Sequence, residues 1–100
     1  MHLTKKEIER ALIFSIAELA RRRKAKNITL NYPEAVALLC DEIMEMARSG
    51  KTLDEVTKEV PKILSKKDVM QGVPELLDTL QVEAIFPDGT KLVVVRNPLS

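Results

Sequence analysis

The sequence predicts an α+β fold in which a bundle of about four helices is followed by a C-terminal antiparallel β-hairpin. Two observations lead to this prediction. Helix-capping pairs recur from residue 4 to residue 68, among apolar residues at helical spacing. Over the last third of the chain the apolar residues alternate instead, on both sides of a turn sequence. We expect one domain, spanning residues 1–100.

Four helix starts are predicted from one repeated device. In each, a capping side chain is followed three residues later by an acidic residue that returns a hydrogen bond to the cap. The pairs are Thr4/Glu7, Asn31/Glu34, Thr52/Glu55 and Ser65/Asp68. The last pair is the weakest, because aspartate is shorter than the usual glutamate, and it predicts only a short helix that ends near Gly72.

The first helix is expected from about Lys5 to about Lys26, with an apolar stripe facing the core. The stripe consists of Ile8, Leu12, Ile16 and Leu19. Ile13 and Phe14 lie more than a quarter turn from its centre, so burying them requires a second contact surface, either another helix or another chain. Asn27 tolerates the left-handed conformation and is expected to end this helix.

The second helix is expected between Asn31 and Gly50, with a proline in its first turn, where it costs no hydrogen bond. Its predicted core face consists of Val36, Leu39, Ile43 and Met46, and its predicted water-facing residues are Asp41, Glu45 and Arg48. A third, short helix begins at Leu53 and should end before Pro61, because proline biases Val60 away from helical geometry.

The C-terminal third predicts a hairpin. Its first strand alternates, with Val82, Ala84 and Phe86 on one face and Gln81, Glu83 and Ile85 on the other. The sequence Pro87-Asp88-Gly89 fits a tight turn in which the glycine supplies a positive φ, and Leu92–Val95 form the second strand. These four apolar residues make both faces of the ribbon apolar. The helices can cover one face, so the other face, or the free edge, is a candidate docking surface.

We identify no catalytic, cofactor-binding or metal-binding residue. Metal sites draw on clusters of histidine, cysteine and acidic side chains, whereas this chain has one histidine, His2, and one cysteine, Cys40, far apart in sequence. Cys40 lies in an apolar run and is interpreted as a small buried hydrophobe. No apolar run is long enough to span a bilayer and no signal peptide is recognised, so a cytoplasmic location is expected.

One basic run, Arg21-Arg22-Arg23-Lys24, allows two interpretations. Cations favour the C-terminal end of a helix, and arginines often anchor interfaces between proteins. Alternatively, the run belongs to a small helical nucleic-acid-binding module. A formal net charge of +1 and only three aromatic residues favour the first interpretation.

Five segments of the chain resemble, in order and spacing, the urease gamma subunit family. They are Asn31–Ala37, Gly50–Thr52, Val69–Glu75, Gln81–Ala84 and Phe86–Val93. The resemblance covers essentially the whole chain. It implies a non-catalytic structural subunit of an enzyme that hydrolyses urea to ammonia and carbamate, with two nickel ions held on the large alpha subunit and no cofactor in this chain.

The resemblance also implies partners, namely the urease beta and alpha subunits, in alpha–beta–gamma units of which three associate. Nucleic acid and membranes are not expected partners. The candidate interface residues are Ile13, Phe14, Arg21, Arg22, Arg23, Leu92, Val93, Val94, Val95 and Arg96. The sequence departs from the family's usual residues at Asn27, Val60, Gln71, Asp78 and Arg96, where the family carries glycine, glycine, glutamate, proline and histidine.

Overall fold

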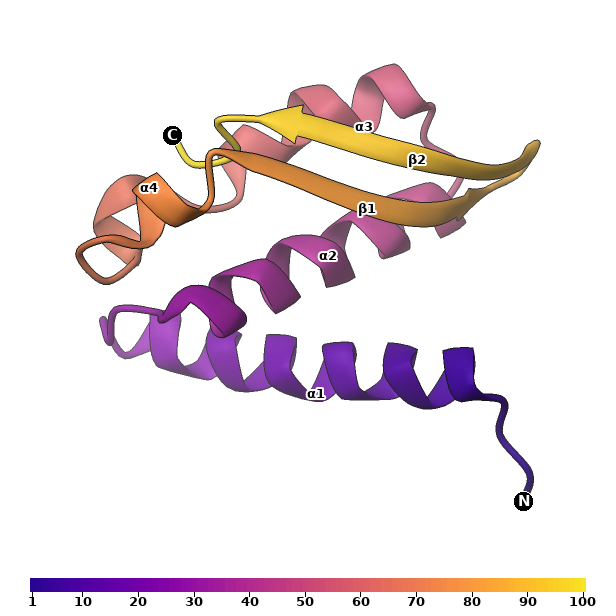
Figure 1. Cartoon of the computed structure of the whole chain (residues 1–100), viewed down its shortest axis with the longest axis horizontal. Coiled ribbons are helices and arrows are strands. Elements are labelled where there is room, and N and C mark those ends of the chain that lie inside the picture. Colours follow the sequence, from indigo (N-terminus) through magenta and orange to yellow (C-terminus); the bar gives the residue numbers. More distant parts are fainter.

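The computed structural model describes all 100 residues as helices followed by a two-stranded antiparallel sheet (Figure 1). The α-helices are α1 (Lys5–Ala25), α2 (Tyr32–Arg48), α3 (Leu53–Glu59) and α4 (Val73–Leu76). Two 3-10 turns, η1 (Val60–Lys62) and η2 (Lys66–Asp68), lie between α3 and α4. The strands are β1 (Thr79–Phe86) and β2 (Gly89–Arg96). This order confirms the predicted α+β fold class.

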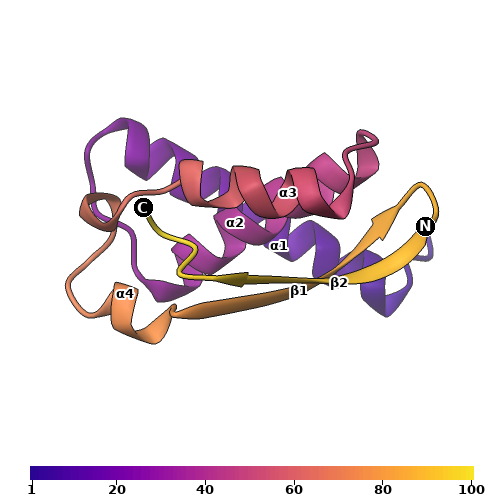
Figure 2. The same ribbon diagram turned by 90° about the horizontal axis from the view of Figure 1, so that it is seen from above.

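Helix α2 occupies the middle of the molecule. Figure 1 shows α1 along one side of it and the hairpin on the opposite side. Helix α3 packs against both β2 and α2, and it runs beside the hairpin in the view from above (Figure 2). Helix α1 packs chiefly on α2. The layers are therefore α1, then α2, then the hairpin with α3.

Reciprocal capping bonds open the first three helices, as the sequence predicts. The Thr4 N–H donates to Glu7 Oε1 at 2.8 Å, and the Glu7 N–H donates to Thr4 Oγ1 at 3.1 Å. The same exchange occurs between Asn31 and Glu34 and between Thr52 and Glu55. Because these bonds form between residues three apart, they are set by local sequence and do not depend on tertiary packing.

The fourth capping pair opens a shorter element than predicted. The Ser65 N–H and hydroxyl both donate to the Asp68 carboxylate, at 2.8 and 3.0 Å, but the 3-10 turn ends at Asp68. Val69 is then extended, because it forms a parallel bridge with Leu30. Gly72, which we expected to end this helix, instead precedes α4 with a φ of +93°.

The apolar stripe that we expected to face the core lies on the outside of α1. Leu12 is 58% exposed, and Ile8, Ile16 and Leu19 are exposed as well. The helix instead buries Ala17 and Ala20 against the rest of the chain. Alanines allow two helices to approach closely, and arginines on α1 then reach carboxylates on α2. Periodicity thus identified an apolar face but assigned it to the wrong side.

Two further predictions need correction. Asp41 was expected to face water, but it is only 2% exposed, because Arg10 and Arg21 cover it. Val60 was expected to leave helical geometry, but its φ and ψ are −54° and −46°. Its N–H donates to the Val56 carbonyl and its side chain is fully buried, and these interactions override the preference that Pro61 imposes.

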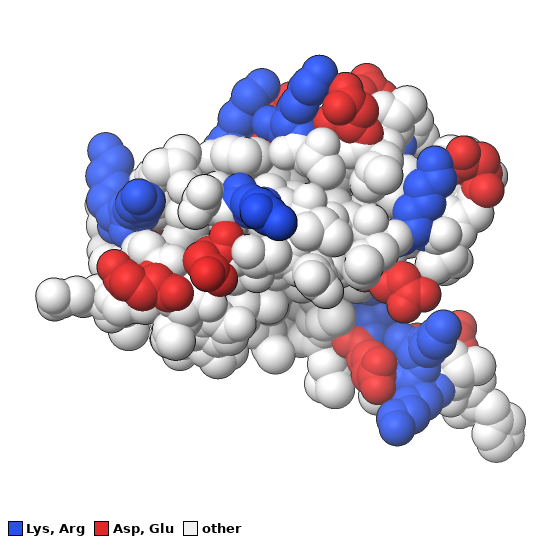
Figure 3. Space-filling view, turned by 45° about the horizontal axis from the view of Figure 1, so that its top comes forward, with Lys and Arg blue, Asp and Glu red and all other residues white.

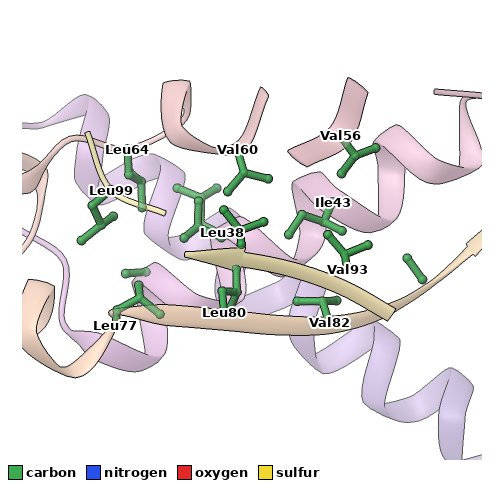
Figure 4. Packing of buried hydrophobic residues seen from close by; sticks show 14 of the residues in the cluster. Leu38, Ile43, Val56, Val60, Leu64, Leu77, Leu80, Val82, Val93 and Leu99 are labelled. Carbon is green, nitrogen blue, oxygen red and sulfur yellow. The ribbon is translucent and has the colours of Figure 1, made fainter. Parts of the chain in front are cut away.

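The main core lies between the inner face of the hairpin and helices α2 and α3 (Figure 4). The strands pair in register, with Val82 opposite Val93 and Leu80 opposite Val95, and these four side chains are buried. Two positive φ values match prediction, +127° at Gly89 in the hairpin turn and +61° at Asn27. Of the 20 residues in the core cluster, Ala20 is the only one from α1.

Candidate interaction surfaces

Helix α1 presents apolar side chains to solvent on two sides. We call Ile8, Leu12, Ile16 and Leu19 the outer stripe. Phe14 lies about 160° around the helix from Leu12, given 3.6 residues per turn, and it is 51% exposed. The candidate residue Ile13 is half-buried next to α2. Of the two residues singled out in the sequence, Phe14 is therefore the more accessible, and the outer stripe adds four others.

Ile13 lines a hollow between the first half of α1, the second half of α2, and β1. Met44 and Ile85 provide further apolar lining. Charged side chains of both signs surround it, among them Lys6, Glu9, Arg48 and Glu83, and charges of both signs lie around a recess at the lower right of Figure 3. The hollow links the exposed surface of α1 with that of the hairpin.

The hairpin has one buried face and one exposed face. On the exposed side, Ile85 is 74% exposed, and Leu92 and Val94 are also accessible. We call these three residues the outer hairpin face. In Figure 3, charged side chains gather mainly toward the margins of the visible surface. The candidate residues Val93 and Val95 point the other way into the core, so the chain itself uses their side chains, whereas Arg96 is exposed.

Arg21, from the basic run, contacts other parts of this chain. Its guanidinium bonds to Glu18 Oε1 at 2.7 Å and to Glu42 Oε1 at 3.0 Å, and it also bonds to Asp41. Arg10 donates to Asp41 Oδ1 at 2.7 Å from the other side. Two arginines of α1 thus converge on one buried carboxylate of α2.

Arg23 is engaged in the same way, since it pairs with the buried Glu34, which also caps α2. Arg22 and Lys24 are exposed and form no ion pair. Only half of the basic run is therefore free to meet a partner. This reduces the support for the nucleic-acid interpretation, which was based on all four cations.

The electrostatics of the Asp41 cluster favour its charged form. Burial acts to raise the pKa of Asp41, but hydrogen bonds from Arg21 and Arg10, together with their positive charge, hold it below its ordinary value of 3.8. Burial acts to lower the pKa of Arg21, and its bonds to Asp41, Glu18 and Glu42 raise it. Asp41 and Arg21 are therefore both ionised at neutral pH, and their ion pair links α1 to α2.

Sequence reasoning missed this cluster. Arg10, Glu34 and Asp41 were not singled out as a group, although Asp41 directly follows the apolar run Ala35–Cys40. An acidic residue placed at the end of such a run was the one available signal, because it lies next to positions that must be buried. Its partners lie 20 and 31 residues away in sequence, so spacing alone could not reveal them.

Comparison with known proteins identifies the family. The family model described as "Urease, gamma subunit" matches residues 1–99. The chain belongs to the urease gamma subunit family. It is 52% identical over 99 residues to the urease subunit gamma of Natronomonas pharaonis, covering 99% of this chain and 91% of that protein. The urease subunit gamma of Prochlorococcus marinus is 49% identical over the full length of both chains. That of Yersinia enterocolitica is 48% identical over 99% of each.

The departures from the usual urease gamma residues fall in different environments. Asn27 holds the left-handed φ that a glycine would adopt, so the exchange preserves the helix end. Val60 fills the core, where a glycine would leave space. Gln71, Asp78 and Arg96 are exposed, and the Asp78 carbonyl accepts a hydrogen bond of 2.7 Å from the Asn97 N–H.

The residues of this urease gamma chain do not fit a nickel site. No group of three or more histidine, cysteine or acidic side chains comes together to hold a metal ion. His2 is exposed near the N-terminus, and Cys40 is half-buried on α2 against the core. Burial raises the pKa of the Cys40 thiol to about 11, so it is protonated at neutral pH. No helix combines the length and apolar character needed to cross a bilayer.

Proposed function

We propose that this chain is a non-catalytic structural subunit of a urease, and that it contributes binding surface to an assembly whose nickel site lies on the alpha subunit. The assembly hydrolyses urea to ammonia and carbamate in the cytoplasm. Membership of the urease gamma family and the word "subunit" in the names of the relatives support this proposal. The partners are the beta and alpha subunits, in alpha–beta–gamma units of which three associate.

The observation that carries the proposal is the outer stripe of α1. Four large apolar side chains, at positions 8, 12, 16 and 19, remain exposed along one side of a 21-residue helix. Fully burying a side chain of this size contributes about 1.5–3 kcal/mol relative to leaving it in water. Large contiguous apolar surfaces of this kind mark protein–protein contacts.

The outer hairpin face gives a second surface for the same assembly. Ile85, Leu92 and Val94 are exposed on one side of a two-stranded sheet whose other side is covered by the chain's own helices. A partner that covers this face removes these three apolar side chains from water, which stabilises the complex. We assign no catalytic, cofactor-binding or metal-binding residue to this chain.

Co-purification with the partner subunits tests the proposal. The chain is co-expressed with urease alpha and beta chains, either unchanged or as Leu12→Glu, and the complex is isolated through the alpha chain. Leu12→Glu should reduce the recovered gamma chain at least about tenfold, because a charge in a buried interface costs well over 1.4 kcal/mol. Ala11→Glu is the matched control, since Ala11 is a neighbouring exposed residue outside the stripe.

Recovery of Ala11→Glu at the unchanged level, with loss of Leu12→Glu, supports the proposal. Equal recovery of the unchanged gamma chain, Leu12→Glu and Ala11→Glu would contradict the role of the outer stripe. Failure of the unchanged chain to join any complex would contradict the structural-subunit function itself.

A further inference from the structure

We propose that α1 is a separable arm, which detaches from α2 as a unit in the free chain while residues 30–99 remain folded. The detached arm exposes the face that carries Ala17 in addition to the outer stripe, so an assembling partner can engage it before it seats on α2. The detachment itself concerns the free chain and does not depend on the proposed function, whereas the engagement by a partner rests on it.

The first argument is that the core is nearly complete without α1. All members of the 20-residue core cluster except Ala20 lie between residues 30 and 99. They come from α2, α3, the hairpin and the segments between them, and the buried Leu99 closes one end (Figure 4). Because Ala20 contributes one methyl group, removing α1 leaves the contacts among the other cluster members in place and uncovers the side of α2 on which α1 packs.

The second argument is that α1 docks through small and charged side chains. Its only fully buried residues are Ala17 and Ala20, which bury little apolar area. Ile13 adds a half-buried apolar contact beside α2, and the rest of the attachment is largely ionic, from Arg10 and Arg21 to Asp41 and from Arg23 to Glu34. Burying such pairs costs desolvation that their attraction largely offsets, and detachment returns both partners to water.

The third argument is that detachment loses nothing on the outer side. The outer stripe is exposed in the docked state already, so its contact with water is the same after detachment. Once detached, a single helix of 21 residues is marginal in water and frays, so its amide hydrogens exchange with solvent. Hydrogen exchange of α1 therefore reports detachment directly.

The test is hydrogen–deuterium exchange of the full free chain, read by mass spectrometry of peptides from α1 and from the centre of α2. Exchange in α1 should be at least about tenfold faster than exchange around Leu39 and Ile43, because the two report different openings. Equal rates would overturn the proposal, since they would mean that α1 opens only when the whole chain unfolds.

Two variants separate the openings further. Val93→Ala removes core packing present both in the docked form and in the form with α1 detached. It should therefore speed exchange in α2 by about tenfold or more and change α1 less than about twofold. Ile43→Val is a milder core variant with the same expected pattern. Equal acceleration of α1 and α2 in either variant would overturn the proposal.

Arg21→Gln gives the complementary result, because it removes the pairs with Asp41 and Glu42 that exist only when α1 is docked, besides one pair with Glu18 on α1 itself. It should speed exchange in α1 several-fold. Arg22→Gln is the matched control. It removes the same charge from the neighbouring residue, whose side chain forms no ion pair, and it should leave hydrogen exchange in α1 unchanged. Equal effects of the two variants would contradict the ionic attachment.

Discussion

Helix α1 and the hairpin differ in how they use their apolar residues. The hairpin turns one apolar face inward, where Val82 and Val93 pack on α2 and α3, and leaves a smaller apolar face outside. Helix α1 does the reverse, since its large apolar residues face outward and alanines with arginines face the chain. The difference teaches that the hairpin belongs to this chain's own core, whereas α1 leaves most of its large apolar side chains in solvent, which is the basis of the proposed subunit contact.

The largest expected effect comes from one residue type placed in the core that the hairpin shares with α2 and on the outer stripe of α1. Ile43→Ala on α2 should lower the free energy of unfolding by about 2–5 kcal/mol, because Ile43 is fully buried. Ile16→Ala on the outer stripe should lower it by less than about 1 kcal/mol. Urea denaturation of the free chain measures both. Similar losses would mean that α1 is buried in the free chain, and would break the comparison.

A smaller effect is expected from neighbouring residues of β2. Val93→Thr should lower the free energy of unfolding by about 1–3 kcal/mol, because it places a hydroxyl in the apolar core, away from water. Val94→Thr, on the exposed side, should change stability by less than about 0.5 kcal/mol. The same denaturation measurement applies. A loss at position 94 as large as at position 93 would show that both faces of the hairpin are covered within the free chain.

The smallest effect concerns the junction between α1 and α2. Asp41→Asn should destabilise the chain by about 1–2 kcal/mol at pH 7, because it removes the charge that Arg10 and Arg21 contact. The folded pKa of Asp41 is lowered, so its contribution is present above its unfolded pKa and is lost as pH falls through the folded pKa. The difference between the unchanged chain and the variant should therefore narrow below about pH 4.

Asp54→Asn provides the control for this pH series, because Asp54 pairs with Lys58 on an exposed surface. The free energy of unfolding of Asp54→Asn should stay close to that of the unchanged chain at both pH 7 and pH 3. A constant difference for Asp41→Asn from pH 7 to pH 3 would contradict the charged role of the Asp41 carboxylate.

The features that the sequence predicted correctly are local ones. Reciprocal bonds such as Thr52/Glu55 act across three residues, and the alternation from Gln81 to Phe86 reflects strand geometry alone. The left-handed conformation of Asn27 follows from its own side chain. Each of these signals lies within a few residues, so a single sequence contains it.

The features that the sequence could not supply depend on distant partners. Val69 is extended because it pairs with Leu30, which cut short the helix expected toward Gly72. The sequence predicts that the apolar stripe of α1 faces the core, but in the structure the face with alanines and arginines packs on α2. That face is favoured because its arginines pair with carboxylates on α2, which lie far away in sequence. Interface residues are hardest of all to predict, since their partner is another chain.

Side-chain footprinting of the assembly tests the central claim most directly. Hydroxyl radicals label exposed leucine, isoleucine and phenylalanine side chains, and labelling is compared between the free chain and the complex with alpha and beta subunits. Leu12, Ile16 and Phe14, which are exposed in the free chain, should lose most of their labelling in the complex. Fully buried Ile43 should be weakly labelled in both. Unchanged labelling of the outer stripe on assembly would contradict its assignment as a subunit contact.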